Sequence, residues 1–163
     1  MNYANWIKFD VTNTKGISTT LFVSGCTHNC KGCFNKEQQN FNYGKLYTKE
    51  FEEEFISFSN NENVNCIAIL GGEPFQQDED LLNLLKRLKK EVKKPIWVWS
   101  GFCFEEILEN PDRRKLLDCI DILIDGKFEL KNRDLKLKYR GSSNQRVIDV
   151  HNSLMKNKVI TIV

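Results

Sequence analysis

The sequence contains no long apolar run, and nothing in it approaches the ~18 consecutive apolar residues that a membrane-spanning helix requires. Its first ten residues also lack the basic segment followed by an apolar segment that marks a secretory signal peptide. The net charge is only +2, so charge alone implies no polyanionic partner such as a nucleic acid. These absences predict a cytoplasmic protein with neither a membrane nor a nucleic acid as its partner.

Cysteine is scarce as well, with six residues in 163, yet three of the six lie within the stretch SGCTHNCKGCFN. Cys26, Cys30 and Cys33 have the spacing C-x3-C-x2-C. Because thiols stay reduced in the cytoplasm, clustered cysteines there indicate a metal or redox site rather than disulfides. A chain of this length, without repeats or a Pro/Gly-rich linker, is expected to form one domain, residues 1–163.

Hydrophobic periodicity predicts strands that alternate with helices. Apolar runs bounded by glycine or polar residues indicate strands at 19–25, 65–72, 95–101 and 120–126. Apolar residues at helical spacing indicate helices at 48–61 and 78–92, and two short helical pieces within 104–119, the second beginning at Pro111. Residues 146–150 and 158–163 look extended, with a helical turn between them. This alternation predicts an α/β fold with a mostly parallel sheet and right-handed crossovers.

Glycine or ionisable residues follow each of the four predicted strands. In parallel sheets, functional groups gather at the carboxyl ends of the strands, which meet at one edge. The four strands should therefore deliver to one edge the cysteine cluster, Gly71-Gly72-Glu73, Ser100-Gly101 and Asp125-Gly126-Lys127. A turn explains any one of these stretches, but their occurrence after all four strands favours a site.

Three metal or redox sites compete for the cysteine cluster. A structural zinc ion needs four ligands, usually in two spaced pairs, and His28 would have to be the fourth within the same short loop. A thioredoxin-like pair, Cys30 and Cys33, leaves Cys26 unexplained. An iron–sulfur cluster with four irons uses thiolate ligands and prefers four of them. Three cysteines therefore leave one iron open to a ligand that is not protein.

The other three cysteines have no such pattern. Cys66 lies in a predicted core strand and Cys119 near the end of a helix, so both are expected to be small buried apolar residues. Cys103 follows Ser100-Gly101 closely enough in sequence to approach the site.

With C-x3-C-x2-C after the first strand and Gly-Gly-Glu-Pro after the second, the chain resembles the radical S-adenosylmethionine (SAM) superfamily. Within it, the stretches MNYANWIKFD, FVSGCTHNCKGCFNK, VWSGF, LIDGKF and RGSSNQRVIDV resemble the family of activating proteins of anaerobic (class III) ribonucleoside-triphosphate reductases. The resemblance runs over nearly the whole chain. It implies a partial (βα) barrel of the radical SAM type whose uncovered mouth admits a protein substrate.

The resemblance also implies the cofactors and the reaction. Cys26, Cys30 and Cys33 would ligate a [4Fe-4S] cluster, and the amino and carboxylate groups of SAM would bind the open iron. One electron from the reduced cluster would cleave SAM, and the resulting 5′-deoxyadenosyl radical would take a hydrogen atom from a backbone glycine of the reductase. The absence of a P-loop or a Ser-His-Asp arrangement agrees with this, because the cofactor supplies the reactivity.

Further residues are assigned to SAM on the same resemblance. The backbone of Gly71 and Gly72, assisted by Glu73, would bind the methionine amino group, and Ser100 would bond the methionine or the ribose. Asp125 and Lys127 match a D-x-K pattern in which the lysine contacts the SAM carboxylate. The adenine would lie beside Gly32, Cys33 and Phe34, although this chain has its aromatic residue after the last cysteine and not before it. His28 is expected to be a structural hydrogen-bonding group beside the cluster.

The implied partners are the reductase itself, an electron donor such as flavodoxin or ferredoxin, and a second copy of the chain in a homodimer. Two other functions remain open at this point. One is a radical SAM enzyme acting on a small molecule, and the other is a zinc-stabilised binding module without catalysis.

Overall fold

The computed structural model describes residues 1–163, which form one seven-stranded sheet with the order β3-β1-β2-β4-β5-β6-β7. The central strands β2 (Ser18–Val23), β4 (Cys66–Gly71), β5 (Ile96–Trp99) and β6 (Ile122–Asp125) are parallel to one another. They correspond to the four strands predicted from the sequence. The mostly parallel α/β sheet is therefore confirmed, and its shape agrees with a partial barrel.

Antiparallel strands border this parallel centre on both sides. β1 (Asn2–Asp10) pairs with β2, and the short β3 (Lys45–Leu46) pairs with β1. At the other side β7 (Arg146–Asp149) pairs with β6. The expectation of an extended segment at 158–163 is met only by a single bridge between Ile148 and Thr161.

The helices lie between the parallel strands along the chain, as the right-handed crossovers require. They are α1 (Lys49–Ser59), α2 (Glu79–Glu91), α3 (Phe104–Glu109) and α4 (Pro111–Leu117), followed after β7 by α5 (Val150–Lys156). Single turns of 3₁₀ helix occur at η1 (Lys36–Gln39), η2 (Pro74–Gln76) and η3 (Leu130–Asn132). None of the helices combines the length and the apolar character that crossing a membrane requires.

Local capping explains where the helices begin. The Thr48 hydroxyl accepts a hydrogen bond from the Phe51 amide at 3.1 Å, and the Asp78 carboxylate accepts one from the Asp80 amide at 3.0 Å. Such caps satisfy amide groups that have no partner within the helix, and each typically contributes about 1 kcal/mol. Pro111 occupies the first turn of α4, where its missing N–H costs nothing.

The main core lies between the sheet and the helices. Phe55 from α1 and a leucine stripe from α2 pack on this face together with buried strand residues, including Leu21, Ile67, Ile69, Val98 and Leu123. Each fully buried side chain of this kind contributes about 1.5–3 kcal/mol.

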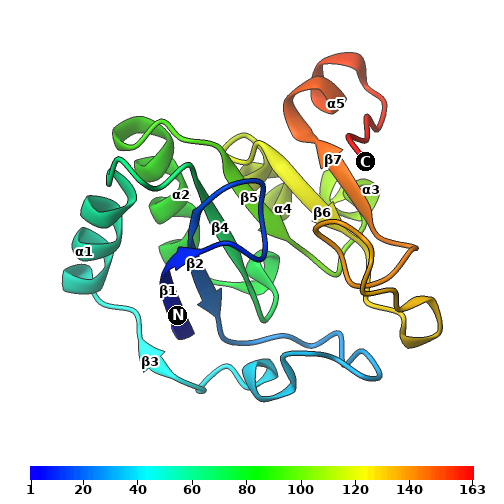
Figure 1. Cartoon of the computed structure of the whole chain (residues 1–163), viewed down its shortest axis with the longest axis horizontal. Coiled ribbons are helices and arrows are strands. Elements are labelled where there is room, and N and C mark those ends of the chain that lie inside the picture. Colours follow the sequence, from blue (N-terminus) through cyan, green and yellow to red (C-terminus); the bar gives the residue numbers. More distant parts are fainter.

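The opposite face of the sheet is covered differently. Trp97 and Ile124 pack there against Trp99 and Tyr139, and Tyr139 belongs to the irregular segment 126–145. Figure 1 shows this segment in orange and the cysteine-bearing segment 24–45 in blue to cyan, both toward the bottom of the view, beyond the arrowhead of β2. Loops rather than helices therefore enclose the space at the carboxyl ends of the parallel strands.

Candidate metal and cofactor site

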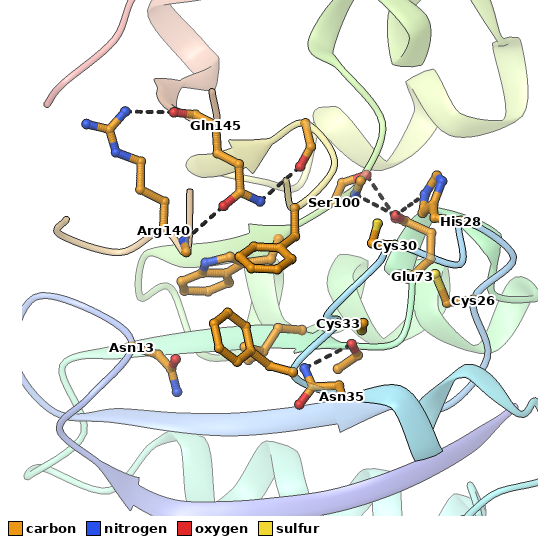
Figure 2. A pocket seen from close by; sticks show the side chains of 18 of the residues that line it. Asn13, Cys26, His28, Cys30, Cys33, Asn35, Glu73, Ser100, Arg140 and Gln145 are labelled. Carbon is orange, nitrogen blue, oxygen red and sulfur yellow. Dashed lines mark hydrogen bonds and ion pairs between the residues drawn. The ribbon is translucent and has the colours of Figure 1, made fainter. Parts of the chain in front are cut away.

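A cavity of about 460 Å³ opens at the carboxyl ends of the parallel strands. All three clustered cysteines line it, together with the ends of β4 and β5 (Figure 2). Its remaining walls come from the β1–β2 connection and from segment 126–145. The lining includes Thr12, Asn13, Phe22, Cys26, His28, Cys30, Cys33, Phe34, Asn35, Leu70, Gly71, Gly72, Glu73, Trp99, Ser100, Gly101, Gly126, Phe128, Tyr139, Arg140, Gly141 and Gln145.

The cysteine loop is held at its start and turns tightly at its end. The amide of Cys26 donates to the Gln39 carbonyl at 3.0 Å, which attaches the loop to η1. The amide of Cys33 donates to the Cys30 carbonyl at 3.1 Å, which forms a turn between these two cysteines. The loop is thus shaped by hydrogen bonds within the protein.

The three thiols are half-buried, and the surroundings of Cys26 and Cys30 oppose the ionisation of these two. Burial raises the pKa of Cys26 to about 11, with smaller contributions from the negative charges of Glu73 and the neighbouring thiolates. Burial and the charge of Cys33 also raise the pKa of Cys30. A bound metal reverses this situation, because a coordinating thiol loses its proton to the cation's charge.

The donor set fits an iron–sulfur cluster better than one metal ion. No three His, Cys, Asp or Glu side chains are gathered closely enough to bind a single ion. In a [4Fe-4S] cluster each cysteine binds a different iron, so the three sulfurs surround the cluster and need not converge on one point. Figure 2 shows the three sulfurs at separate points on one wall of the cavity.

Gly71 and Gly72 let the end of β4 lie against the start of the cysteine loop. A Cβ on Gly72 would lie 2.5 Å from the Gly25 carbonyl oxygen, and one on Gly71, where φ is +109°, would lie 2.6 Å from the Val23 carbonyl oxygen. The Gly72 amide donates to Val23 at 2.7 Å, whereas the Gly72 carbonyl accepts no hydrogen bond from the chain. Gly72, which lines the cavity with the cysteines, therefore has a backbone acceptor without a partner in the chain.

The Glu73 carboxylate is buried and occupied by protein donors. One of its oxygens accepts hydrogen bonds from the Ser100 hydroxyl and the Phe75 amide, each at 2.9 Å. The other accepts from the Gly101 amide and lies against His28 Nε2, each at 2.7 Å. The structure therefore joins Glu73 and Ser100 to one another, and both to the cysteine loop through His28.

Other residues that the sequence assigned to SAM lie at or beyond the edge of the cavity. Asp125 is buried, but its carboxylate accepts hydrogen bonds from the Phe104 amide and from Arg146, and it does not line the cavity. Lys127 is exposed, although its positive charge is close enough to lower the pKa of Cys30 against the larger effect of burial.

The residues assigned to adenine lie near the mouth of the cavity. Phe34 is 57 % exposed and lines the cavity, with its ring centroid 4.8 Å from that of Phe128. Gly32 lies outside the lining, and a Cβ there would meet Leu130 at 3.0 Å. Cys103 is the N-cap of α3, the residue just before the helix, and does not reach the cavity.

Sequence reasoning missed the residues of segment 126–145 that close the far wall. Gln145 accepts hydrogen bonds from the amides of Gly141 and Ser142 at 2.9 and 3.1 Å and donates to the Gly126 carbonyl at 2.9 Å. The Trp99 indole donates to the Tyr139 carbonyl at 2.7 Å. The available signal was the run Gly-Ser-Ser-Asn-Gln, which is typical of a turn with side-chain hydrogen bonds.

Comparison with known proteins also indicates an iron–sulfur protein. The sequence model of the 4Fe-4S single cluster domain family matches residues 12–148. The anaerobic ribonucleoside-triphosphate reductase-activating protein of Escherichia coli (strain K12) is 40% identical over 152 residues, covering 90% of this chain and 97% of the relative. The proteins of that name from Haemophilus influenzae and phage T4 are 39% and 36% identical over 150 residues, covering 89% and 90% of this chain and 96% and 93% of the relatives.

Proposed function

Because this chain belongs to the family of anaerobic ribonucleoside-triphosphate reductase-activating proteins, which carry a 4Fe-4S radical SAM domain, we propose that it places a glycyl radical on its reductase. The observation that carries the proposal is that three cysteines and the glycine-lined end of β4 face the same cavity. The whole chain, residues 1–163, would form a single radical SAM domain.

The proposed cluster ligands are Cys26, Cys30 and Cys33. Three thiolates satisfy three irons of a [4Fe-4S] cluster and leave the fourth for SAM. The cluster and SAM supply one-electron chemistry when they are bound, and the chain supplies their binding and orientation.

The proposed SAM contacts begin at the Gly72 carbonyl, which has no partner in the chain and suits a protonated amino group. Phe34 and the backbone of Gly32–Phe34 would lie beside the adenine at the mouth. Lys127 would reach the SAM carboxylate, since its charge already acts on Cys30. Ser100 would support the site through its hydrogen bond to Glu73 rather than by a free hydroxyl.

Asp125 has a different proposed role from the one the D-x-K pattern implied. Its carboxylate holds Arg146 and the first amide of α3, so it would fix the position of the strand end from which Lys127 extends. The aromatic and aliphatic part of the cavity wall, which includes Phe22, Leu70 and Trp99, would exclude water from the reacting groups.

The remaining partners are also proposals. Reduction of the cluster requires a one-electron donor, for which flavodoxin or ferredoxin is suited, and the protein would act in the cytoplasm as a homodimer or bound to its reductase. The loop-covered mouth of the cavity is the entry for the reductase's glycine segment, because helices cover the opposite face of the sheet.

The test is to mix the anaerobically reconstituted protein with its reductase, SAM and a reductant and to record electron paramagnetic resonance (EPR) spectra. We expect a glycyl radical signal on the reductase and formation of 5′-deoxyadenosine. Cleavage of SAM without a glycyl radical would contradict the assigned substrate.

The ligand assignment has its own test. Cys26→Ala, Cys30→Ala and Cys33→Ala should each lose both iron and SAM cleavage, whereas Cys103→Ala, outside the cavity, should retain both. Retention of 5′-deoxyadenosine production by any of the first three variants would refute the three-ligand assignment.

A further inference from the structure

His28 lies inside the cysteine loop, between two of the proposed cluster ligands, and reaches across the cavity wall to Glu73. The His28 side chain is only 7 % exposed and that of Glu73 is 1 % exposed. Its Nε2 atom lies 2.7 Å from one Glu73 oxygen, so a loop residue is joined to a carboxylate that follows β4, 45 positions later in the chain. Figure 2 shows this contact beside Cys26 and Cys30.

The hydrogen-bond donors around Glu73 use the acceptor capacity of both its oxygens, so none remains for a cofactor group. Besides His28, its two oxygens receive the Ser100 hydroxyl and the amides of Phe75 and Gly101. A carboxylate bonded to four donors can take up another only by losing one of them, and a buried donor left without an acceptor is costly. The structure therefore indicates that the carboxylate supports the fold of the site and does not contact SAM.

The imidazole ring packs closely against the residues that follow β5. A Cβ on Gly101 would lie 2.5 Å from His28 Cδ2, so any other residue at this position would displace the ring. The ring of Phe102 meets the imidazole edge-on, with centroids 4.5 Å apart. The ends of β4 and β5 thus hold His28 by a hydrogen bond, by close backbone approach and by an aromatic contact.

We propose that His28 is a positioning residue for the cluster. Through Glu73 it fixes the segment between Cys26 and Cys30 on the ends of β4 and β5, which keeps these thiols aligned with the Gly72 carbonyl, the proposed contact of SAM. This inference rests on the proposed function. It adds that the histidine and the glutamate act together, and that losing their contact weakens SAM binding even when the cysteines are intact.

The sharpest test compares two amide substitutions of the same residue. In His28→Gln the side-chain nitrogen is as many bonds from the backbone as Nε2, so it can still donate to Glu73. In His28→Asn the side-chain nitrogen is one bond closer to the backbone, so it does not reach Glu73. His151→Asn is the matched control, because His151 is the only other histidine and is exposed on α5.

We expect His28→Asn to raise the KM for SAM by at least about tenfold, the equivalent of one hydrogen bond to a charged group. The same variant should weaken the change that SAM causes in the EPR spectrum of the reduced cluster. His28→Gln should stay within about twofold of the parent for both, and His151→Asn should match the parent. A His28→Asn variant that behaves like the parent, or Gln and Asn variants that are equally impaired, would overturn the proposal.

Glu73→Gln tests the same link from the other side and remains informative if His28→Asn folds poorly. If the two residues act together, Glu73→Gln should raise the KM for SAM, and the double variant should be no worse than the more impaired single variant. Additive losses would overturn the proposal. Failure of the parent protein to hold iron or cleave SAM would instead contradict the proposed function, so the two failures are distinguishable.

Discussion

Asp125→Asn is the substitution that best separates a structural role from a cofactor-binding one. The Asp125 side chain is 1 % exposed and accepts hydrogen bonds from the Phe104 amide at 2.7 Å and from Arg146 Nε and Nη2 at 3.0 and 2.5 Å. Asparagine has nearly the same shape, but it has one acceptor oxygen and one donor nitrogen and carries no charge. In either orientation of the amide, a donor of Phe104 or Arg146 therefore faces an NH₂ group.

The expected loss can be worked out from these contacts. A hydrogen bond to a charged group contributes about 1.5–3 kcal/mol, and breaking a buried ion pair costs about 3–5 kcal/mol. Arg146 is one-third exposed and keeps Glu105 as a partner at 2.7 Å, which moderates the loss. We therefore expect the unfolding free energy to fall by about 2–3 kcal/mol, which for a chain of this size corresponds to a decrease in Tm of about 4–12 °C.

Urea unfolding of the cluster-free protein measures this loss, since a bound cluster would disturb two-state behaviour. Glu105→Gln is the matched control, because it removes the exposed carboxylate of the same arginine and should cost less than about 1 kcal/mol. The Asp125→Asn protein could instead unfold at the same urea concentration as the parent protein and have a much higher KM for SAM. In that case Asp125 contacts the cofactor and its proposed structural role is wrong.

Two further predictions concern the glycine contact and the pH dependence. Gly72→Ala places a Cβ 2.5 Å from the Gly25 carbonyl oxygen, so it should separate β4 from the cysteine loop and reduce 5′-deoxyadenosine production about 100-fold. Gly16→Ala is the control, because Gly16 lies at the other end of the β2–β4 pair and has a φ of +88°. This variant should lose about 1–2 kcal/mol of stability and keep its SAM cleavage. Equal SAM-cleaving activities of the Gly72→Ala and Gly16→Ala proteins would refute the reasoning. Hydrogen bonds from Arg146 lower the pKa of Glu105 below its usual 4.5. Ionised Glu105 therefore stabilises the fold above pH 4.5. This contribution is lost as the pH falls through the lower pKa that Glu105 has in the folded protein. The difference in unfolding free energy between the parent and Glu105→Gln should therefore shrink between about pH 5 and pH 3, and a constant difference would contradict it.

The parallel centre of the sheet could be predicted because its residues have strong periodic patterns. β4 is a continuous apolar run buried at Cys66–Ile69, and the leucines of α2 recur on one face. β1 has no such pattern, because it is a border strand whose residues are mostly half-buried or exposed. The apolar segment 158–163 follows α5, and it meets β7 only at the bridge between Thr161 and Ile148, through backbone hydrogen bonds of Ile160 and Ile162.

In the site, the sequence could identify residue types but not their partners. Gly71, Gly72 and the three clustered cysteines were expected at the cavity and they line it, whereas Gly32 lies outside the lining. Glu73 and Ser100 were expected to bind SAM, whereas the structure bonds them to one another across 27 positions of the chain. A linear pattern does not contain such a contact, because it depends on how two neighbouring strands end.

The hydrogen bonds that anchor the cysteine loop also bear on how the enzyme is maintained. Cys26, Cys30 and Cys33 contribute nothing to the buried core, and the loop is attached to the strand ends by contacts between protein groups. This differs from zinc fingers, in which the metal is required for folding. If oxidation removed the cluster, the sheet and its cavity would remain folded. A new iron–sulfur cluster could then be inserted into the same polypeptide, and the protein need not be synthesised again.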